Sequence, residues 1–376
     1  MPPPIRLLVV GEFAYSSGSS NIVREYVRAG PSAGFEVRIA AGFGHSDRRV
    51  RAELPHEPDA SWATHALVIY EGRPFLDERA LAALERVVPR TRRAVVDCDG
   101  HYAPLVRVDG DDNAWPCGLA AWRAAIEAAG ELILQPAIGQ PAPGTVRWPY
   151  FGMPPSPPRR DALRKRLTMQ YVGNNWFRAK ALLAVFASVR AASPGARLQV
   201  RGRGWDGSSL PGLERGTYAD PADLHALGIR VARPAPFGRV TETMSQSILA
   251  PVLLRPVLSK LGLLTPRMLE TAAARTIPVY TEADPIVSAL YNDAGALCLG
   301  ADRPPVLGEI LSDIPASKPS PPNLAPACHR TTATWQTSAR SAASSTNANH
   351  PLNRDPSGAD RAKQPGQTPR TQPQHP

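Results

Sequence analysis

A threonine, a proline, an arginine and a glutamate gather at the start of one predicted helix, Pro266 to Arg275. The Thr265 side chain can cap this helix, and Pro266 suits its first turn. Unbonded amides at such a helix start attract anions, and Arg267 can donate two hydrogen bonds to one phosphate. Glu270, about one turn further on, can accept hydrogen bonds from ribose hydroxyls. The spacing predicts a nucleotide site, although an ordinary packed helix with a surface Glu and Arg accounts for it equally well.

A second polar group follows the expected strand Met169 to Val172. Gly173 lets the backbone approach a ligand, and the two asparagines after it supply amide donors or adopt a left-handed turn. An arginine and a lysine in the next helix can neutralise a diphosphate. Gly202 and Gly204 follow the next strand and suit close approach to a nucleotide base, although a simple turn explains them too. The donor-binding candidates of this half are Gly173, Asn174, Asn175, Arg178, Lys180, Gly202, Gly204, Thr265, Arg267 and Glu270.

Two aspartates and a histidine end the expected strand Arg93 to Asp97, in the string Asp-Cys-Asp-Gly-His. Ligands bind at the carboxyl ends of strands in open parallel sheets, so this position favours a functional role. Three chemistries compete: a divalent metal on Asp97 and Asp99, a phosphatase that uses Asp97 as nucleophile, and a general base at His101. We favour the third, with His101 and Asp99 as the catalytic candidates. The plainer alternative is a buried aspartate that caps a loop beside a solvated histidine.

Short apolar strands alternate with helical segments along residues 1–311, which predicts parallel, doubly wound sheets. The expected strands are 5–10, 35–40, 66–70, 93–97, 131–134, 169–172, 197–201, 228–231, 248–254, 277–280 and 295–299. The expected helices are 21–29, 77–88, 119–129, 178–192, 240–247, 266–275, 285–291 and one that begins at 305. We predict an α/β protein with two Rossmann-like domains, 1–150 and 168–311, joined by a proline-rich linker, 151–167.

The two segments of the second half resemble the donor site of GT-B glycosyltransferases. Leu264 to Tyr280 is similar to the motif Glu-x7-Glu followed by Ala-x-Gly-x-Pro, and it most resembles the CgeB-like (spore-maturation protein) branch. The matching positions are Thr265, Arg267, Glu270 and Pro278. The resemblance implies the GT-B fold, a nucleotide-sugar donor held by the second domain, and no bound metal. It also places His101 like the first-domain histidine of many such enzymes.

The sequence departs from the motif at three positions. The first glutamate falls at Gly262, and Leu269 stands where Phe is usual. Arg275 replaces the usual glycine and is expected to crowd a tight turn. Despite these departures, we expect Glu270 to face the 173–178 turn across one pocket.

The acceptor side is expected in the first domain. The resemblance implies that the loop after the first strand faces the cleft, which makes Glu12, Ser20 and Asn21 candidates, although Ser20 or Asn21 as a plain helix cap explains them too. That loop is not GxGxxG, so a dinucleotide site is disfavoured. Asp111 and Asn113 can bind sugar hydroxyls, but the same residues commonly form only a turn.

The chain changes character after about residue 311. Residues 312–376 are rich in Pro, Ser, Thr, Asn and Gln and lack periodic apolar positions, so we expect a disordered tail. The abrupt end of the helix that begins at 305 favours a frame-shifted C-terminus. GT-B proteins usually end in helices that pack back on the first domain. Without them, a weakened clamp and impaired activity are expected.

Bulk composition narrows the possible partners and compartment. The chain has 376 residues and a formal charge of +10, with arginines spread along it and no basic block, which disfavours nucleic acid and suits a small anionic ligand. Cys98, Cys117, Cys298 and Cys328 form no CxxC, so we expect reduced thiols in a cytoplasmic protein. No signal peptide is evident, and the most apolar stretch, 248–264, is broken by charged residues and proline.

The sequence therefore predicts transfer of a sugar from a nucleotide-diphosphate sugar to an unknown glycan, lipid or protein acceptor. We expect no cofactor, no metal and no membrane span, with peripheral membrane contact left open. One alternative is a non-catalytic protein of the same fold that binds nucleotide sugars or glycans. The other is the phosphatase that uses Asp97 and Asp99.

Overall fold

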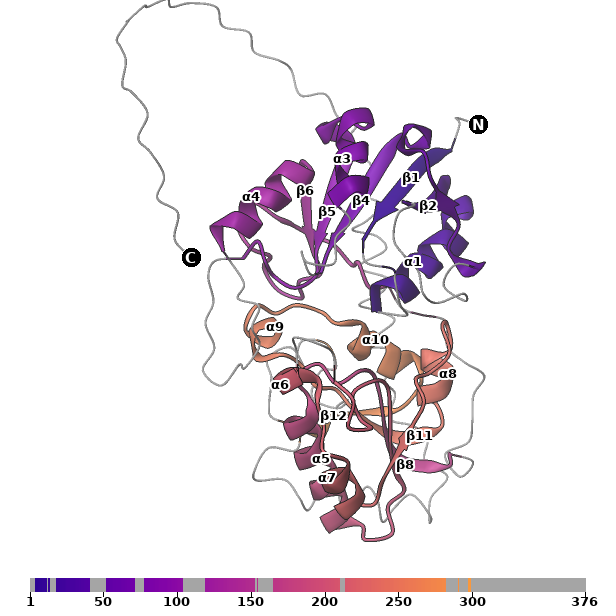
Figure 1. The fold of residues 1–376 in the computed structure, drawn as a ribbon, viewed down its shortest axis with the longest axis vertical. Coiled ribbons are helices and arrows are strands. Elements are labelled where there is room, and N and C mark those ends of the chain that lie inside the picture. Colours follow the sequence, from indigo (N-terminus) through magenta and orange to yellow (C-terminus); the bar gives the residue numbers. More distant parts are fainter. Residues whose placement is uncertain are drawn as a thin grey trace, which may run out of the picture. The chain divides into compact units, whose positions relative to one another are not determined.

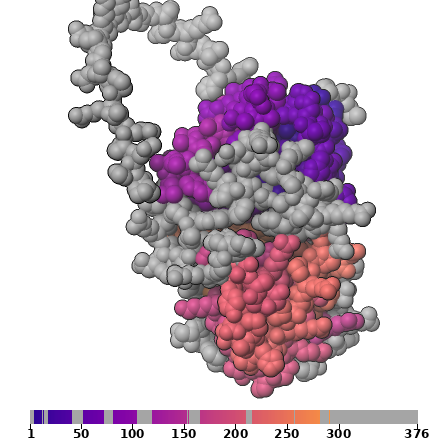
Figure 2. Space-filling model, viewed as in Figure 1, coloured from indigo at the N-terminus to yellow at the C-terminus, as the bar shows by residue number. Residues whose placement is uncertain are grey.

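The computed structural model describes two parallel β-sheets with helices packed around them (Figure 1). The described residues are 4–11, 13, 18–40, 52–71, 78–103, 119–152, 154, 165–209, 214–281, 290 and 297–298. Figure 2 shows the described residues of the second half, pink to orange, as a continuous surface on the face in view. The expected α/β class and the two sheets are confirmed.

The first sheet has the strand order β3-β2-β1-β4-β5-β6-β7, all in parallel pairs. Its strands are β1 (Ile5–Val10), β2 (Phe35–Ala40), β3 (His56–Glu57), β4 (His65–Tyr70), β5 (Arg93–Asp97), β6 (Leu132–Gln135) and β7 (Val146–Arg147). Its α-helices are α1 (Gly18–Ala29), α3 (Glu78–Val87) and α4 (Ala120–Ala129). Because the order reverses between β1 and β4, a ligand crevice is expected at the carboxyl ends of these strands.

The second sheet has the order β10-β9-β8-β11-β12-β13. Its strands are β8 (Leu167–Val172), β9 (Leu198–Arg201), β10 (Ile229–Ala232), β11 (Ser247–Pro251), β12 (Ile277–Tyr280) and β13 (Leu297–Cys298). Its helices are α5 (Ala179–Ala192), α6 (Glu214–Thr217), α7 (Pro221–Ala226), α8 (Val240–Met244), α9 (Pro256–Lys260) and α10 (Pro266–Ala273). The order reverses between β8 and β11, so the loops after these two strands flank the corresponding crevice.

One apolar cluster joins the two halves. It combines Val9 and Ile22 from the first half with Phe237, Leu264 and Met268 from the second, all buried. Strands buried on both faces explain why the sequence reads as short continuous apolar runs. The shared cluster brings the carboxyl ends of both sheets to the same interior.

A short backbone connection reinforces this packing. The segments 136–138 and 262–264 meet in an antiparallel bridge. Within it the Leu264 amide donates to Pro136 O at 2.7 Å. The loop that leads into α10 is thus held by the loop that follows β6.

Most predicted strands and helices in the described residues are confirmed, with differences at the ends. α1 begins at Gly18 rather than Asn21, because Ser19 and Ser20 are buried as part of the helix. α8 ends at Met244, because the next strand starts at Ser247 and pairs with β8.

Some short elements carry too little pattern to be predicted, namely β3, β7, α6, α7 and α9. The expected helix that begins at 305 and the tail 312–376 lie outside the described residues, as does nearly all of 285–291. The predicted domain boundaries stay a prediction.

Candidate functional site

The turn between β8 and α5 is tied to the loop after β9 by its two asparagines. Asn174 Oδ1 accepts a hydrogen bond from the Arg203 amide (3.0 Å), and Asn175 Nδ2 donates to Gly204 O (3.2 Å). Asn175 is buried, and its Oδ1 accepts from the Arg178 amide (3.1 Å) at the start of α5. These amides therefore hold the turn in shape.

Of the two alternatives for the asparagines, the amide donor holds for Asn175, whereas the left-handed residue of this turn is Phe177 (φ 55°). The Phe177 amide donates to Gly216 O (2.5 Å), and its ring lies where a Cβ on Gly216 would stand. A glycine across from it makes room for the aromatic ring, while the asparagine side chains are already engaged with the backbone.

Gly202 and Gly204 are required by the packing of the loops themselves. A Cβ on Gly202 would stand 1.9 Å from Gly173 O. A Cβ on Gly204 (φ 75°) would stand 2.4 Å from Thr217 O. The plainer interpretation, a tight turn, thus explains both glycines without a ligand.

These loops nevertheless border a cavity of about 700 Å³ at the carboxyl ends of β8, β9 and β10. Four predicted donor residues line it: Asn174, Asn175, Gly202 and Gly204. Arg203 and Arg233, which we did not single out from the sequence, line it as well. The volume lies within the usual range for small-molecule sites.

The start of α10 holds the four residues that opened the sequence argument. Thr265 is the N-cap residue, but its hydroxyl makes no capping hydrogen bond, so that expectation is wrong. The reason is that the Met268 amide already donates to Thr265 O (3.2 Å). Glu270 is buried and lies 3.2 Å from Arg267 in an i,i+3 ion pair.

Tyr171 links this helix to the β8–α5 turn. The Arg267 guanidinium lies over the Tyr171 ring at 5.7 Å, and Arg178 Nη1 donates to the Tyr171 hydroxyl at 2.9 Å. A Cβ on Gly173 would stand 2.9 Å from the same hydroxyl, so this glycine makes room for Tyr171. Lys180 is exposed in the first turn of α5.

The expected single pocket between the turn and Glu270 stays a prediction. Glu270 is not among the residues that line the 700 Å³ cavity, and within the described residues the two segments meet at Tyr171. A buried tyrosine on β8 fills the space between them, which sequence spacing alone does not reveal.

Three residues at the N-caps of α5, α9 and α10 carry buried donors that have no hydrogen-bond partner among the described residues. They are Arg178 (Nε), Arg255 (Nε and Nη2) and Thr265 (Oγ1). Arg178 follows β8, and Arg255 and Thr265 lie in the connection from β11 to α10; the strand order reverses between β8 and β11. A buried donor left unpaired costs about 1–3 kcal/mol, so these groups favour a ligand that accepts hydrogen bonds.

At the first sheet, Asp97 is fully buried and engaged on both oxygens. It accepts hydrogen bonds from the amides of His101 (2.8 Å) and Tyr102 (2.9 Å) and from Gln135 Nε2 (2.8 Å). Burial raises the pKa of the Asp97 carboxyl, and the nearby His101 ring and these hydrogen bonds offset part of that rise. A carboxylate so enclosed caps its loop and presents no free oxygen for nucleophilic attack.

His101 is fully buried, which differs from the cleft-facing position we expected. Its ring stacks on Trp122 with centroids 4.0 Å apart, and Nε2 lies 2.9 Å from Glu71 O. A carbonyl only accepts, so Nε2 carries the hydrogen, and a neutral ring keeps its lone pair on Nδ1. Nδ1 is buried without a partner. Its role as a base stays a prediction.

Asp99 is the more accessible carboxylate of this loop, with a side chain 21% exposed. Its Oδ2 lies 3.8 Å from His101 Nε2, and its Oδ1 lies 3.5 Å from Arg255 Nη1. Arg255 belongs to the loop after β11, so this ion pair joins the candidate sites of the two sheets. Sequence reasoning missed Arg255, since nothing in its local pattern separates it from the other arginines.

Of the acceptor candidates, two fall in the described residues. Ser20 is buried inside α1 rather than capping it, and Asn21 Oδ1 accepts a hydrogen bond from the Gly238 amide (3.0 Å). Glu12, Asp111 and Asn113 lie outside the described residues. The acceptor role of all five stays a prediction.

The two main departures from the donor motif have a backbone explanation. Gly262 is left-handed (φ 65°), a conformation that a glutamate would adopt only with strain. Arg275 also is left-handed (φ 54°) and exposed, so it takes up the glycine conformation without the crowding we expected. Its carbonyl accepts from Lys165 Nζ (2.6 Å).

Solved structures share this architecture. HepE (Alr3699) of Anabaena in complex with UDP and glucose aligns with a TM-score of 0.58 at 12% identity, covering 90% of this chain and 100% of that one. An alpha-glucosyltransferase in complex with UDP and a 13-mer DNA aligns at 0.56 and 12% identity, covering 92% and 99%. The fold is GT-B. T4 phage BGT with its UDP-glucose substrate aligns at 0.54 and 14% identity, covering 90% and 99%.

Sequence comparison adds no family. No protein-family model matches the chain, and no curated protein sequence does. Within the described residues, no helix is long and apolar enough to cross a membrane, and no cluster of three His, Cys, Asp or Glu could hold a metal ion. Cys98 is a free, buried thiol.

Proposed function

We propose that this GT-B protein is a glycosyltransferase that moves a sugar from a nucleoside-diphosphate sugar to an acceptor. The observation that carries the proposal is the set of buried, unpartnered donors on Arg178, Arg255 and Thr265. A diphosphate is rich in acceptor oxygens and carries the opposite charge to the two guanidiniums. The solved structures with this fold that contain UDP support the same ligand class.

In this proposal the second sheet binds the donor. Arg178 and Thr265 hold the diphosphate, and their charge and dipoles stabilise the leaving group as the sugar departs. Arg267 orients Glu270 for the ribose hydroxyls through their ion pair. The nucleotide base occupies the cavity of about 700 Å³ bordered by Gly202 and the other loop residues after β8, β9 and β10.

The first sheet supplies the groups that act on the acceptor. Asp99 is the carboxylate with exposed surface, and His101 Nδ1 holds the available lone pair of the ring. Either group, within reach of the acceptor hydroxyl, can take its proton while the sugar is transferred. Arg255 pairs with Asp99 and so ties this carboxylate to the donor side.

We further propose that the chain is a CgeB-like transferase that works in the cytoplasm without a metal. The matches at Thr265, Arg267 and Glu270 support the branch. Basic side chains and helix amides near the diphosphate can replace the charge that a cation supplies. The acceptor is a glycan, lipid or protein.

The test is a panel of nucleoside-diphosphate sugars with the full chain. We expect calorimetry to show tight binding of one nucleoside diphosphate. When an acceptor is added to the matching nucleotide sugar, we expect the sugar to be transferred and the nucleoside diphosphate to be released. Glu270→Ala should raise KM for the donor. Duplex DNA belongs in the acceptor panel, because one of the similar structures contains DNA. Binding without turnover across donors and acceptors would instead support a non-catalytic nucleotide-sugar-binding protein.

A further inference from the structure

Helix α1 of the first sheet contacts the second half of the chain at two places beside the proposed donor site. At its start, a Cβ on Gly18 would stand 2.9 Å from the ring of Pro266, the first residue of α10. One turn later, α1 reaches the loop between β10 and α8 at Gly238. We infer that Asn21 and Arg24 of α1 are positioning residues that hold this loop in the form that binds the donor. The inference rests on the proposed function.

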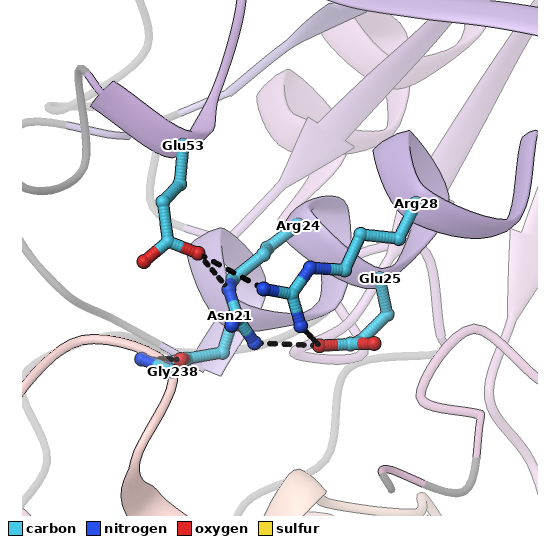
Figure 3. A network of polar contacts seen from close by, with 6 residues as sticks. All are labelled: Asn21, Arg24, Glu25, Arg28, Glu53 and Gly238. Atoms are coloured by element: carbon cyan, nitrogen blue, oxygen red, sulfur yellow. Dashed lines mark hydrogen bonds and ion pairs between the residues drawn. The ribbon is translucent and has the colours of Figure 1, made fainter.

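The first contact is a hydrogen bond between a side chain and the backbone. Asn21 Oδ1 accepts from the Gly238 amide at 3.0 Å, across 217 positions of sequence (Figure 3). Because the donor is a main-chain amide, this bond fixes the path of the loop rather than the rotamer of one side chain.

The second contact is the packing of Arg24 on the same loop. Its guanidinium lies over the Phe237 ring at 5.9 Å. Ion pairs with Glu25 (2.8 Å) and with Glu53 orient the guanidinium from the first half (Figure 3). Only 13% of the Arg24 side chain is exposed. The position of the guanidinium is therefore fixed by contacts within the first half as well as by the loop.

Gly238 suits both contacts and tolerates no side chain. Its φ is 70°, and a Cβ there would stand 2.5 Å from Arg24 Cζ. Its neighbour Phe237 is buried in the apolar cluster shared by the two halves. Two consecutive residues therefore hold the loop in place. Phe237 contributes a buried ring and a cation–π contact, and Gly238 contributes a hydrogen bond.

Phe237 and Gly238 lie a few positions along the chain from residues that line the cavity. Arg233 and Pro234 of the same loop line the cavity of about 700 Å³, and the Arg239 amide closes a turn on Pro236 O (3.0 Å). A loop fixed at Gly238 therefore fixes one wall of the proposed base site. Donor affinity then depends on residues of the first half that do not touch the donor.

Hydrogen–deuterium exchange of the peptides that span 236–240 tests directly whether α1 holds this loop. In Asn21→Ala we expect exchange at the Gly238 amide to quicken by about fivefold or more, as the loss of one hydrogen bond predicts. Asn21→Asp keeps an acceptor oxygen and should stay within about twofold of the wild type. Unchanged exchange in Asn21→Ala, or equal effects of Ala and Asp, would overturn the inference.

Arg28→Ala is the matched control. Arg28 sits on the same helix, is 53% exposed, and pairs with Glu25 (3.7 Å) and Glu53 (3.4 Å) (Figure 3). It should leave exchange at 236–240 unchanged. If it speeds exchange as much as Asn21→Ala does, the effect belongs to α1 stability and the inference is wrong.

Donor kinetics separate this inference from the function it rests on. With the donor found in the panel and the acceptor at saturation, Asn21→Ala should raise the donor KM about three- to tenfold, a larger change than that in kcat, and Asn21→Asp should restore the donor KM. A faster exchange with an unaltered donor KM would overturn the positioning role. If the wild type binds no nucleoside diphosphate, the proposed function fails. The exchange result still decides whether α1 holds the loop at Gly238.

Discussion

The carboxyl ends of the two sheets carry similar polar residues but treat them differently. At the first sheet, both oxygens of Asp97 accept hydrogen bonds, three in all, from groups of its own half. At the second sheet, Arg178 and Thr265 keep buried donors that meet no acceptor atom among the described residues. Since buried polar groups are nearly always paired, the Asp97 carboxylate is complete within the protein, whereas the donors of Arg178 and Thr265 are free to meet the acceptor atoms of a ligand. The unpaired donors are thus the feature of the second sheet that supports a binding site.

The largest expected effect is at Arg178. Arg178→Met removes a charge-assisted contact to the diphosphate, worth about 1.5–3 kcal/mol, so the nucleotide Kd should rise roughly 10- to 100-fold in calorimetry. Arg197→Met is the matched control. Arg197 is an exposed arginine just before the amino end of β9, whereas the cavity lies at the carboxyl end. Equal losses in both variants would mean that general charge, and not this site, attracts the nucleotide.

Asp97→Asn tests the self-contained side of the comparison. Asparagine offers one acceptor oxygen to three donors, and Gln135 cannot turn its amide round, since its Oε1 accepts from the Ala142 amide (2.9 Å). We expect the free energy of unfolding to fall by about 1–3 kcal/mol in chemical denaturation. Asp99→Asn, partly exposed, should cost less than about 1 kcal/mol. Nucleotide affinity should be unchanged in the Asp97 variant; a selective loss of affinity with normal stability would contradict the comparison.

Thr265→Val sharpens the other side. Valine has the same shape and removes a hydroxyl that the folded protein leaves unpaired. The melting temperature should therefore hold or rise, and the free energy of unfolding should increase by about 1 kcal/mol at most. Nucleotide affinity should fall about three- to tenfold. A clear loss of stability in the free protein would reveal a partner for this hydroxyl and remove it from the proposed site.

Arg275→Gly probes the departure from the donor motif. The left-handed conformation costs a non-glycine residue energy, so glycine should raise the free energy of unfolding by about 0.5–1 kcal/mol after its greater freedom in the unfolded chain is counted. Ala272→Gly, inside α10, should lower it by a similar amount. Thermal unfolding of the pair decides the sign.

The last prediction concerns Lys165, whose Nζ donates to Ser247 O and Arg275 O. Burial, and then the charge of Arg275, lowers the pKa of Lys165 to about 8 from 10.5. Between these values the unfolded chain holds a proton that the folded chain has released, so stability should rise with pH from about 8 to 10.5. The slope should stay below about 1 kcal/mol per pH unit and vanish in Lys165→Met. A falling slope would reverse the assignment.

The fold was largely readable from the sequence. Runs such as Ile5–Val10 and Ile277–Tyr280 are short and apolar, and their alternation with amphipathic helices leaves few arrangements other than parallel sheets. Short elements such as α9 were not predicted, because five residues carry no periodic signal. The positions of Thr265 and Glu270 on α10 were also predicted, since capping and helical spacing are local properties.

Tertiary structure alone decided which of these residues are complete within the protein. The sequence determined that Asp97, Arg178 and Thr265 would stand at strand ends and helix starts, because local chain geometry sets those places. It could not determine that Asp97 meets Gln135, or that Asn21 meets Gly238, because such partners lie far apart along the chain. Hydrogen bonding and burial depend on those distant partners. The choice between a structural residue and a binding residue is therefore made by the packing of the folded chain.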